Sequence, residues 1–431
     1  MKITNTFENP SPVIEKFLRY IAVDTQSSET SGAHPSTEKQ KDLGRMLTAE
    51  LEAMHAENIV YDEEHNYVYA AIPATADADE VVGFIAHMDT SPETSGTDVR
   101  PQFIRDYDGS DIPLGPAVRG SGDAPLVLSP KQFPELLEYK GKTLITTDGS
   151  TLLGADDKAG VAEIMAMAEV LLGDIEAAKA AGTEPQYRHG RIAIAFTPDE
   201  EIGEGTAFFD LEQFGADVAY TVDGGALGEI EYETFNAAAA TVTVKGVTVH
   251  PGEAKGKMVN AAAIAAEFHC ALPADQVPEK TEGREGFFYL CEMQGETEEA
   301  TAKYIIRDHD RGLFEEKKQL MRDLEARFNE KYGAGVVNVA LKDQYYNMRE
   351  KIDPGYLYLV DRAEAAMRDL GIEPRIQPIR GGTDGASLSF RGLPCPNLCA
   401  GGHNFHGRFE YVPVESMEAI VELLLQIATA K

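Results

Sequence analysis

Short apolar runs of strand length recur along this chain, at 66–73, 81–86, 191–197 and 218–222, and segments with other patterns separate them. Strands that are apolar on both faces are typical of a sheet covered by helices on both sides. The strongest helical pattern, at 157–180, supports such a layered arrangement. The pattern therefore predicts an α/β fold in which helices flank a central mixed sheet.

The pattern changes between 235 and 346, where strands and helices follow in the order β-α-β-β-α-β. This order predicts a ferredoxin-like module, inserted into the larger domain. The expected organisation is a catalytic domain formed by 1–234 and 347–431, with a separate domain at 235–346. The elements expected in the insertion are strands at 237–245, 287–294, 302–308 and 335–342 and helices at 259–270 and 312–332.

Two further segments, 12–23 and 37–54, have the apolar spacing of helices. The stretch 96–140 is rich in Gly, Pro and Asp, and we expect it to be irregular.

The charge of the chain argues against two classes of partner. Acidic residues outnumber basic ones by 72 to 39, and a net charge of -33 repels nucleic acids and anionic membranes. No apolar run is long enough to span a membrane, and the N-terminus lacks the apolar core of a signal peptide. The four cysteines form no disulfide framework. These features predict a cytoplasmic protein with reduced cysteines.

Residues able to bind a metal follow the apolar strands. In open α/β sheets the functional site lies beyond the carboxyl ends of the strands. A further acidic pair begins the strongest helix. The segments concerned are His87-Met88-Asp89, Asp156-Asp157, Glu200-Glu201, Asp223-Gly224-Gly225 and His403-Asn404-Phe405-His406.

Each of these signals has an ordinary structural explanation when it is taken alone. Asp156 and Asp157 could cap the helix, and Glu200 and Glu201 could form a solvated turn. Chemistry alone does not distinguish His403 from His406. The coincidence of these five segments at one edge of one predicted sheet is a more specific signal than any of them alone. Two histidines with three carboxylates suit a pair of zinc-class ions that share a carboxylate, and they suit calcium poorly.

At these residues the sequence resembles the M20 family of metal-dependent peptidases. The resemblance extends over nearly the whole chain, and the insertion matches the family's lid, or dimerisation, domain. The matching segments are AHMDTSP (86–92), TLLGADDKAGVAEIM (151–165), AFTPDEEIG (195–203), YTVDGG (220–225), VHPG (249–252), YYNMRE (345–350), RGGTDGASLSF (380–390), GLPCPNL (392–398) and HG (406–407).

The resemblance implies two zinc ions per subunit. His87 and Asp223 would bind one ion, Glu201 and His406 would bind the other, and Asp156 would bridge the two.

Further roles follow from the same resemblance. Asp89 would support His87, and Glu200 would be the general base. His250 and Arg380 lie in motifs that the family uses around the substrate. The peptide bond between Asp156 and Asp157 is a candidate for the cis form.

The function implied is that of an aminopeptidase that releases the N-terminal residue from short peptides, with tripeptides preferred. A homodimer through the lid domain would be consistent with the family. One alternative is an M20 amidase, deacylase or carboxypeptidase acting on acylated amino acids, which shares the metal ligands but needs no free α-amino group on its substrate. A non-catalytic metal-binding protein is a second alternative, which the loss of Glu200 or of a ligand would favour, and none is lost.

Overall fold

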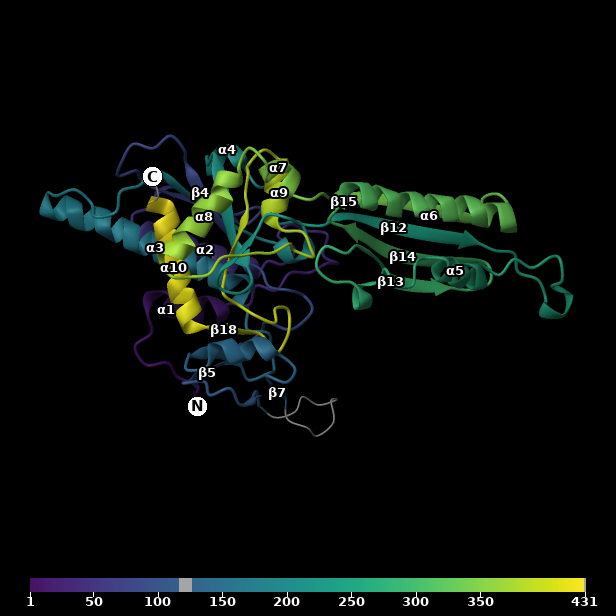
Figure 1. The fold of residues 1–431 in the computed structure, drawn as a ribbon, viewed down its shortest axis with the longest axis horizontal. Helices are drawn as coiled ribbons and strands as arrows, with labels where there is room; N and C mark the ends of the chain where they lie inside the picture. The colour runs from purple at the N-terminus through teal and green to yellow at the C-terminus, as the bar shows by residue number, and fades with distance from the viewer. Residues whose placement is uncertain (116–125, 430–431) are drawn as a thin grey trace. The chain divides into compact units, whose positions relative to one another are not determined.

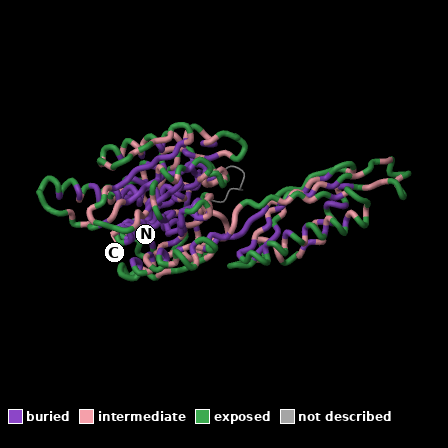
Figure 2. The backbone as a smooth tube through the Cα atoms, turned by 90° about the horizontal axis from the view of Figure 1, so that it is seen from above, coloured by how far each residue is buried: buried purple, intermediate pink, exposed green. Residues whose placement is uncertain are grey.

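The computed structural model describes residues 1–115 and 126–429, and it divides the chain into two compact units (Figure 1). Unit 1 contains 1–232, 351–377 and 383–431. Unit 2 contains 233–350 together with the short segment 378–382. Buried residues are concentrated inside each unit (Figure 2), so each has its own hydrophobic core.

An eight-stranded mixed sheet forms the centre of unit 1, in the order β16-β11-β17-β10-β4-β9-β3-β2. Strands β17, β10, β4 and β9 run parallel, whereas β3 and β2 are antiparallel to their neighbours. The structure thus confirms the predicted mixed sheet. The strands are β2 Glu57–Asp62, β3 Tyr67–Ile72, β4 Val82–His87, β9 Ile192–Thr197, β10 Val218–Gly224, β11 Glu229–Glu231, β16 Arg375–Ile376 and β17 Asn397–Cys399.

Helix α3, Ala155–Ala181, packs against β4 and β10, and α1 and α10 pack against α3 in turn (Figure 1). The first half of α3 is buried on nearly all sides, which explains its almost continuous run of apolar and small residues. No helix within 1–115 and 126–429 is long and apolar enough to cross a membrane. The other helices of unit 1 are α1 Pro12–Ile21, α2 Gln40–Ala53, α4 Leu211–Phe214, α8 Leu357–Asp369, α9 Asp384–Phe390 and α10 Val414–Thr429; α7, Arg349–Ile352, spans the boundary between the units.

The start of α3 lies very close to β10. A Cβ atom on Gly160 would lie 1.9 Å from the carbonyl oxygen of Val222, so only glycine permits this approach. Asp157 Oδ1 accepts the backbone N–H of Gly160 at 3.2 Å, in the manner of an N-cap. The close approach brings the beginning of α3 beside the end of β10, where Asp223 lies.

A second sheet in unit 1 corrects the expectation that 96–140 is irregular. The stretch contributes β5 to a four-stranded antiparallel sheet in the order β1-β5-β8-β18. Phe103 of β5 packs into the main core of the unit, and Ile104 packs into a separate buried cluster, so tertiary packing makes this segment a strand. Residues 116–125 of the stretch lie outside the described residues. The strands are β1 Lys2–Thr4, β5 Pro101–Arg105, β8 Leu144–Thr147 and β18 Tyr411–Pro413, with a small hairpin of β6 Ile112–Pro113 and β7 Val127–Leu128.

Unit 2 has the predicted β-α-β-β-α-β order. Its antiparallel sheet has the order β13-β14-β12-β15, and burial alternates along β12 and β14 as expected for a sheet covered on one face. The rings of Phe268 and Phe328, from α5 and α6, lie 5.3 Å apart, so both helices cover the same face. The elements are β12 Asn236–Lys245, α5 Ala261–Cys270, β13 Phe287–Gly295, β14 Glu299–Asp308, α6 Arg311–Tyr332 and β15 Val337–Tyr345.

Candidate metal centre

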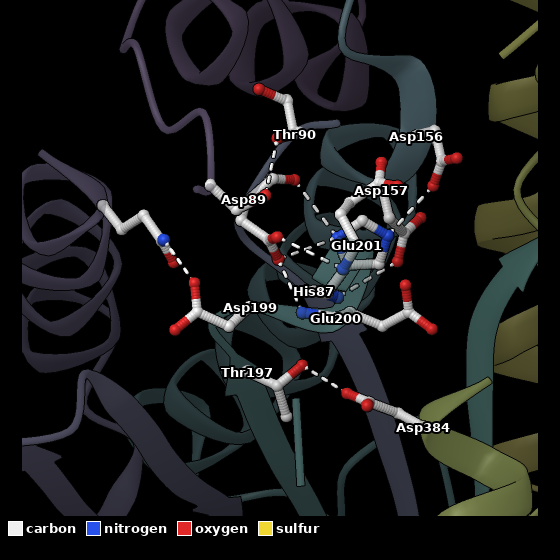
Figure 3. A network of polar contacts seen from close by, with 12 residues as sticks. His87, Asp89, Thr90, Asp156, Asp157, Thr197, Asp199, Glu200, Glu201 and Asp384 are labelled. Carbon is white, nitrogen blue, oxygen red and sulfur yellow. Dashed lines mark hydrogen bonds and ion pairs between the residues drawn. The ribbon is translucent and has the colours of Figure 1, made fainter. Parts of the chain in front are cut away.

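The parallel strands of unit 1 bring their carboxyl ends to one edge of the sheet. His87 ends β4 and pairs in register with Thr197, which ends β9. A single 3-10 turn, Glu200–Ile202, follows β9, and Asp223 lies near the end of β10. Figure 3 shows His87, Asp156, Glu200 and Glu201 gathered at this edge.

The Asp156 carboxylate lies between two imidazole rings. Its Oδ1 is 2.9 Å from Nε2 of His87, and its Oδ2 is 3.1 Å from Nε2 of His406. A carboxylate whose two oxygens face different ligands has the geometry needed to bridge two ions. The Asp156–Asp157 peptide bond is cis, as the family resemblance implies.

One further carboxylate accompanies each histidine. Asp223 Oδ1 lies 3.4 Å from Nε2 of His87, and Glu201 Oε2 lies 2.9 Å from Nε2 of His406. The structure therefore brings together all five expected ligands as two half-sites that share Asp156. Candidate ligand atoms of His87, Asp156 and Glu201 lie within 4.8 Å of one another.

The electrostatics of the cluster favour a cation. Burial opposes ionisation of Asp156, but hydrogen bonds with His406 and His87 outweigh it and lower the pKa of this carboxyl. Burial acts to lower the pKa of His406, yet its contacts with Asp156 and Glu201 raise it to about 11. Burial, and then the charge of Asp156, raise the pKa of Glu201 to about 8. These shifts reflect a concentration of negative charge that a bound cation would balance.

The residues present fit a pair of metal ions. The donor set combines imidazole nitrogens with carboxylate oxygens, which suits zinc-class ions. Glu201 Oε1 is buried and has no hydrogen-bond partner, which leaves a lone pair directed into the protein. A buried acceptor without a partner is costly, and coordination of a cation would satisfy it.

Asp157 is a different case from its neighbour. Its side chain is buried, and Asp157 with His87 and Asp223 forms a second group of potential metal ligands. However, its Oδ2 accepts the backbone N–H of His87 at 3.2 Å, and its Oδ1 caps α3. Of the two alternatives that the sequence left open, capping therefore applies to Asp157, whereas Asp156 faces the histidines.

Asp89 contacts both parts of the site. Its Oδ1 lies 3.3 Å from Nδ1 of His87, and its backbone carbonyl lies 3.1 Å from the same nitrogen. The Asp89 carboxylate also accepts the backbone N–H groups of Glu200 and Glu201, at 3.0 and 3.3 Å. The sequence suggested the first contact but not the second, which links the His87 loop to the glutamate turn.

The two adjacent glutamates differ in their surroundings. Glu201 is engaged with His406, whereas the Glu200 carboxylate has no hydrogen-bond or ion-pair partner within 1–115 and 126–429. Burial, followed by the charge of Asp223, raises the pKa of Glu200 well above its usual range. Glu200 thus lies beside the ligand cluster, but its carboxylate is not paired with any of the ligands.

His403 and His406 are separated by their contacts. His403 Nε2 lies 2.6 Å from the hydroxyl of Tyr139, and its ring stacks on Tyr411 at a centroid distance of 4.6 Å. Burial lowers the pKa of His403 to about 4, which favours its neutral form. Of these two histidines, only His406 faces the carboxylates of Asp156 and Glu201.

Two buried acidic residues around the site escaped the sequence analysis. Glu410 accepts backbone N–H groups of Leu153, Gly154 and Asp156, at 2.7 to 3.1 Å. Asp384 accepts the hydroxyl of Thr197 at 2.8 Å (Figure 3). Asp384 lies in the RGGTDG segment, in which the sequence pattern points only to Arg380. Glu410 has no signal in the sequence beyond its position four residues after His406.

The two expected substrate residues belong to unit 2. His250 is exposed, and its Nδ1 accepts the backbone N–H of Gly252 at 3.2 Å. Arg380 donates to the carbonyls of Gly283 and Glu285 and to the hydroxyl of Thr281, at 2.8 to 3.1 Å. Much of its hydrogen-bonding capacity is therefore used within unit 2.

The chain is similar to several known proteins over nearly its whole length. Residues 232–336 match the family model described as the peptidase dimerisation domain. The chain is 53% identical to peptidase T of Geobacillus thermodenitrificans over 416 residues, which cover 96% of this chain and 97% of that protein. Among solved structures, aminopeptidase PepT from Bacillus cereus superposes with a TM-score of 0.72 at 22% identity, covering 97% of each chain. A dinuclear metal-binding peptidase of the M20 family from Bacillus subtilis superposes with a TM-score of 0.61 at 14% identity, covering 97% of this chain and 96% of that one.

Proposed function

Because this chain belongs to the peptidase T family of M20 metallopeptidases, we propose that it is a metal-dependent aminopeptidase. Its substrates are short peptides with a free α-amino group, and tripeptides are preferred. The observation that carries this proposal is the position of the Asp156 carboxylate between His87 and His406, each of which has its own further carboxylate.

We propose zinc as the metal, with two ions per subunit. His87 and Asp223 would hold one ion, His406 and Glu201 the other, and Asp156 would contact both. When bound, such a pair supplies an activated water and polarises the scissile carbonyl group. The mixture of imidazole and carboxylate ligands supports zinc over calcium or magnesium.

Glu200 is the general base of the proposed reaction. Its carboxylate lies beside the ligand cluster, and burial together with the charge of Asp223 raises its pKa, which favours uptake of a proton by this group. It would take the proton of the attacking water and pass it to the leaving amine nitrogen. Asp89 supports both the ligand His87 and the base Glu200, because it orients the His87 ring and accepts the backbone N–H of Glu200.

Unit 2 would supply substrate contacts and the interface between subunits. His250 would stabilise the developing oxyanion, and Arg380 would bind the C-terminal carboxylate of a tripeptide. The match of 232–336 to a dimerisation domain supports a homodimer through this unit. A cytoplasmic location belongs to the same proposal, and it is supported by four cysteines that are all free thiols.

Turnover of free and N-acetylated tripeptides of the same sequence tests the proposal. Purified enzyme loaded with zinc should release the N-terminal residue from the free peptide and leave the acetylated peptide intact. Prior treatment with a chelator should abolish this activity, and added zinc should restore it. Equal turnover of both peptides would indicate the amidase or deacylase class instead.

A further inference from the structure

The residue before the two glutamates has an unusual environment. Asp199 is fully buried, although it lies two residues after the end of β9 and begins the turn that carries Glu200. Its backbone has a φ of 54°, in the left-handed region that aspartate and asparagine tolerate better than most residues. A buried carboxylate is costly unless several donors surround it.

The donors come from a segment that is distant in the sequence. Asp199 Oδ2 accepts the backbone N–H of Ser36 at 2.6 Å, and Oδ1 accepts the Ser36 hydroxyl at 2.5 Å and the Gln40 amide at 2.7 Å. Nδ1 of His34 lies 3.3 Å from Oδ2. The carboxylate of Asp199 is thus surrounded by donors from the residues that precede and begin α2.

The same N-terminal segment also holds the loop that carries Asp89. Thr90 donates its backbone N–H to Thr25 at 3.3 Å, and its carbonyl accepts the backbone N–H of Ser27 at 3.0 Å. Gln26 donates its amide to the carbonyl of Ser91 at 3.2 Å. Residues 25–40 therefore contact both segments that meet at Glu200, the loop after β4 and the turn after β9.

We propose that Asp199 is a positioning residue, which fixes the turn of Glu200 against residues 34–40 so that the base keeps its place beside the metal ligands. The Asp89 carboxylate accepts the backbone N–H groups of Glu200 and Glu201. Asp199, the residue before them, is anchored through its own carboxylate to Ser36. Neither contact uses the Glu200 carboxylate, which stays available for proton transfer. The inference rests on the proposed role of Glu200 as the base.

The test is Asp199→Asn, since asparagine has the same shape and accepts the positive φ. Its amide group replaces an acceptor oxygen and would oppose the donors of Ser36 or Gln40. We expect kcat for a free tripeptide to fall about tenfold or more, because misplacement of a catalytic group by ~1 Å can cost 100-fold. KM and the bound zinc should remain within twofold of the wild-type values, on the order of experimental error for such parameters.

Asp210→Asn is the matched control. Asp210 lies on the same connection after β9, and its carboxylate accepts two backbone N–H groups at the start of α4. This variant loses a similar type of contact but should keep kcat unchanged. If Asp199→Asn folds poorly, Gln40→Met removes one donor while leaving Asp199 in place, and we expect a smaller loss of kcat with full zinc content. Ser36→Ala should lower kcat in the same direction, and Ser36→Thr, which keeps the hydroxyl, should recover it.

The outcomes separate this inference from the function on which it rests. Wild-type kcat in folded Asp199→Asn, or in Gln40→Met and Ser36→Ala together, would overturn the inference. Loss of zinc in parallel with kcat would also overturn it, because Asp199 would then act through the ligand Glu201. Failure of the proposed base role would appear separately, as substantial turnover by Glu200→Ala.

Discussion

The Glu410 carboxylate fixes the backbone of Asp156, because its Oε1 accepts the backbone N–H of Asp156 at 3.1 Å. Its Oε2 accepts the backbone N–H groups of Leu153 and Gly154. The side chain of Asp156 thereby faces the two histidines from a backbone that is fixed by a second, buried carboxylate. Because Glu410 is far from Asp156 in the sequence, the position of the central ligand depends on the packing of the C-terminal segment.

Glu410→Gln should therefore weaken metal binding without removing any ligand. Its amide group can accept fewer backbone hydrogen bonds, and the loss of such supporting contacts typically costs about 10- to 100-fold in metal affinity. Zinc affinity measured by competition with a chelator checks this. Glu415→Gln is the control, because Glu415 accepts the backbone N–H of Thr143 with both oxygens but does not contact the ligand segment. Equal zinc affinity of wild type and Glu410→Gln would contradict the prediction.

Substitution of the adjacent glutamates should separate catalysis from metal binding. Glu200→Ala should abolish turnover and leave the zinc content near that of the wild type, because the Glu200 carboxylate has no partner within the described part of the chain. Glu201→Ala should lower the zinc content itself, because Glu201 faces His406 at 2.9 Å. Metal analysis alongside kcat distinguishes the two. A similar loss of zinc in both variants would show that the roles are divided wrongly.

The stability of the metal-free protein should depend on pH through His406. Its pKa is raised from 6.5 to about 11 in the fold, so the folded protein binds this proton more tightly than the unfolded chain. The resulting stabilisation is complete below about pH 6.5 and is lost as pH rises toward about 11. The difference in free energy of unfolding between wild type and His406→Ala, measured by urea denaturation in chelator, should therefore decrease with rising pH. A constant difference across this range would exclude the proposed proton.

Zinc binding should also release this proton, since a metal-bound imidazole is neutral at its ligating nitrogen. Calorimetric titrations in buffers with different ionisation enthalpies measure the release directly. His406→Ala should release fewer protons than the wild type at pH 7.

Arg380→Ala should impair tripeptides with a free C-terminal carboxylate more than their C-terminal amides. A guanidinium binds a carboxylate through paired hydrogen bonds that an amide cannot fully replace. Arg380 also donates to Thr281, Gly283 and Glu285, so its removal also releases that segment and needs a control. Thr281→Val removes one of these contacts and keeps the guanidinium, and it should not change the preference for acids over amides. If the wild-type enzyme shows the same KM for the tripeptide acid and its amide, Arg380 does not bind the C-terminal carboxylate.

The stretch 96–140 shows where local patterns mislead. Its Gly, Pro and Asp content indicated an irregular segment, yet β5 pairs with β1 and β8, and β8 pairs in turn with β18, so the sheet joins strands from distant parts of the chain. Such short strands have little intrinsic preference, and tertiary pairing decides their structure. Strands β3, β4, β9 and β10 were predictable because each is an apolar run that is almost entirely buried, and all six residues of β3 and of β9 are buried.

Local sequence patterns predict the α/β sheet, the β-α-β-β-α-β insertion and the metal-binding residue types that follow the strands, because strand ends and helix starts are encoded locally. Long-range packing selects which member of each pair turns toward the site. Asp156 and Asp157, like His403 and His406, are chemically alike, and their long-range contacts separate them. The supporting carboxylates of Glu410 and Asp199 were not predictable for the same reason, since the donors that they satisfy lie more than a hundred residues away.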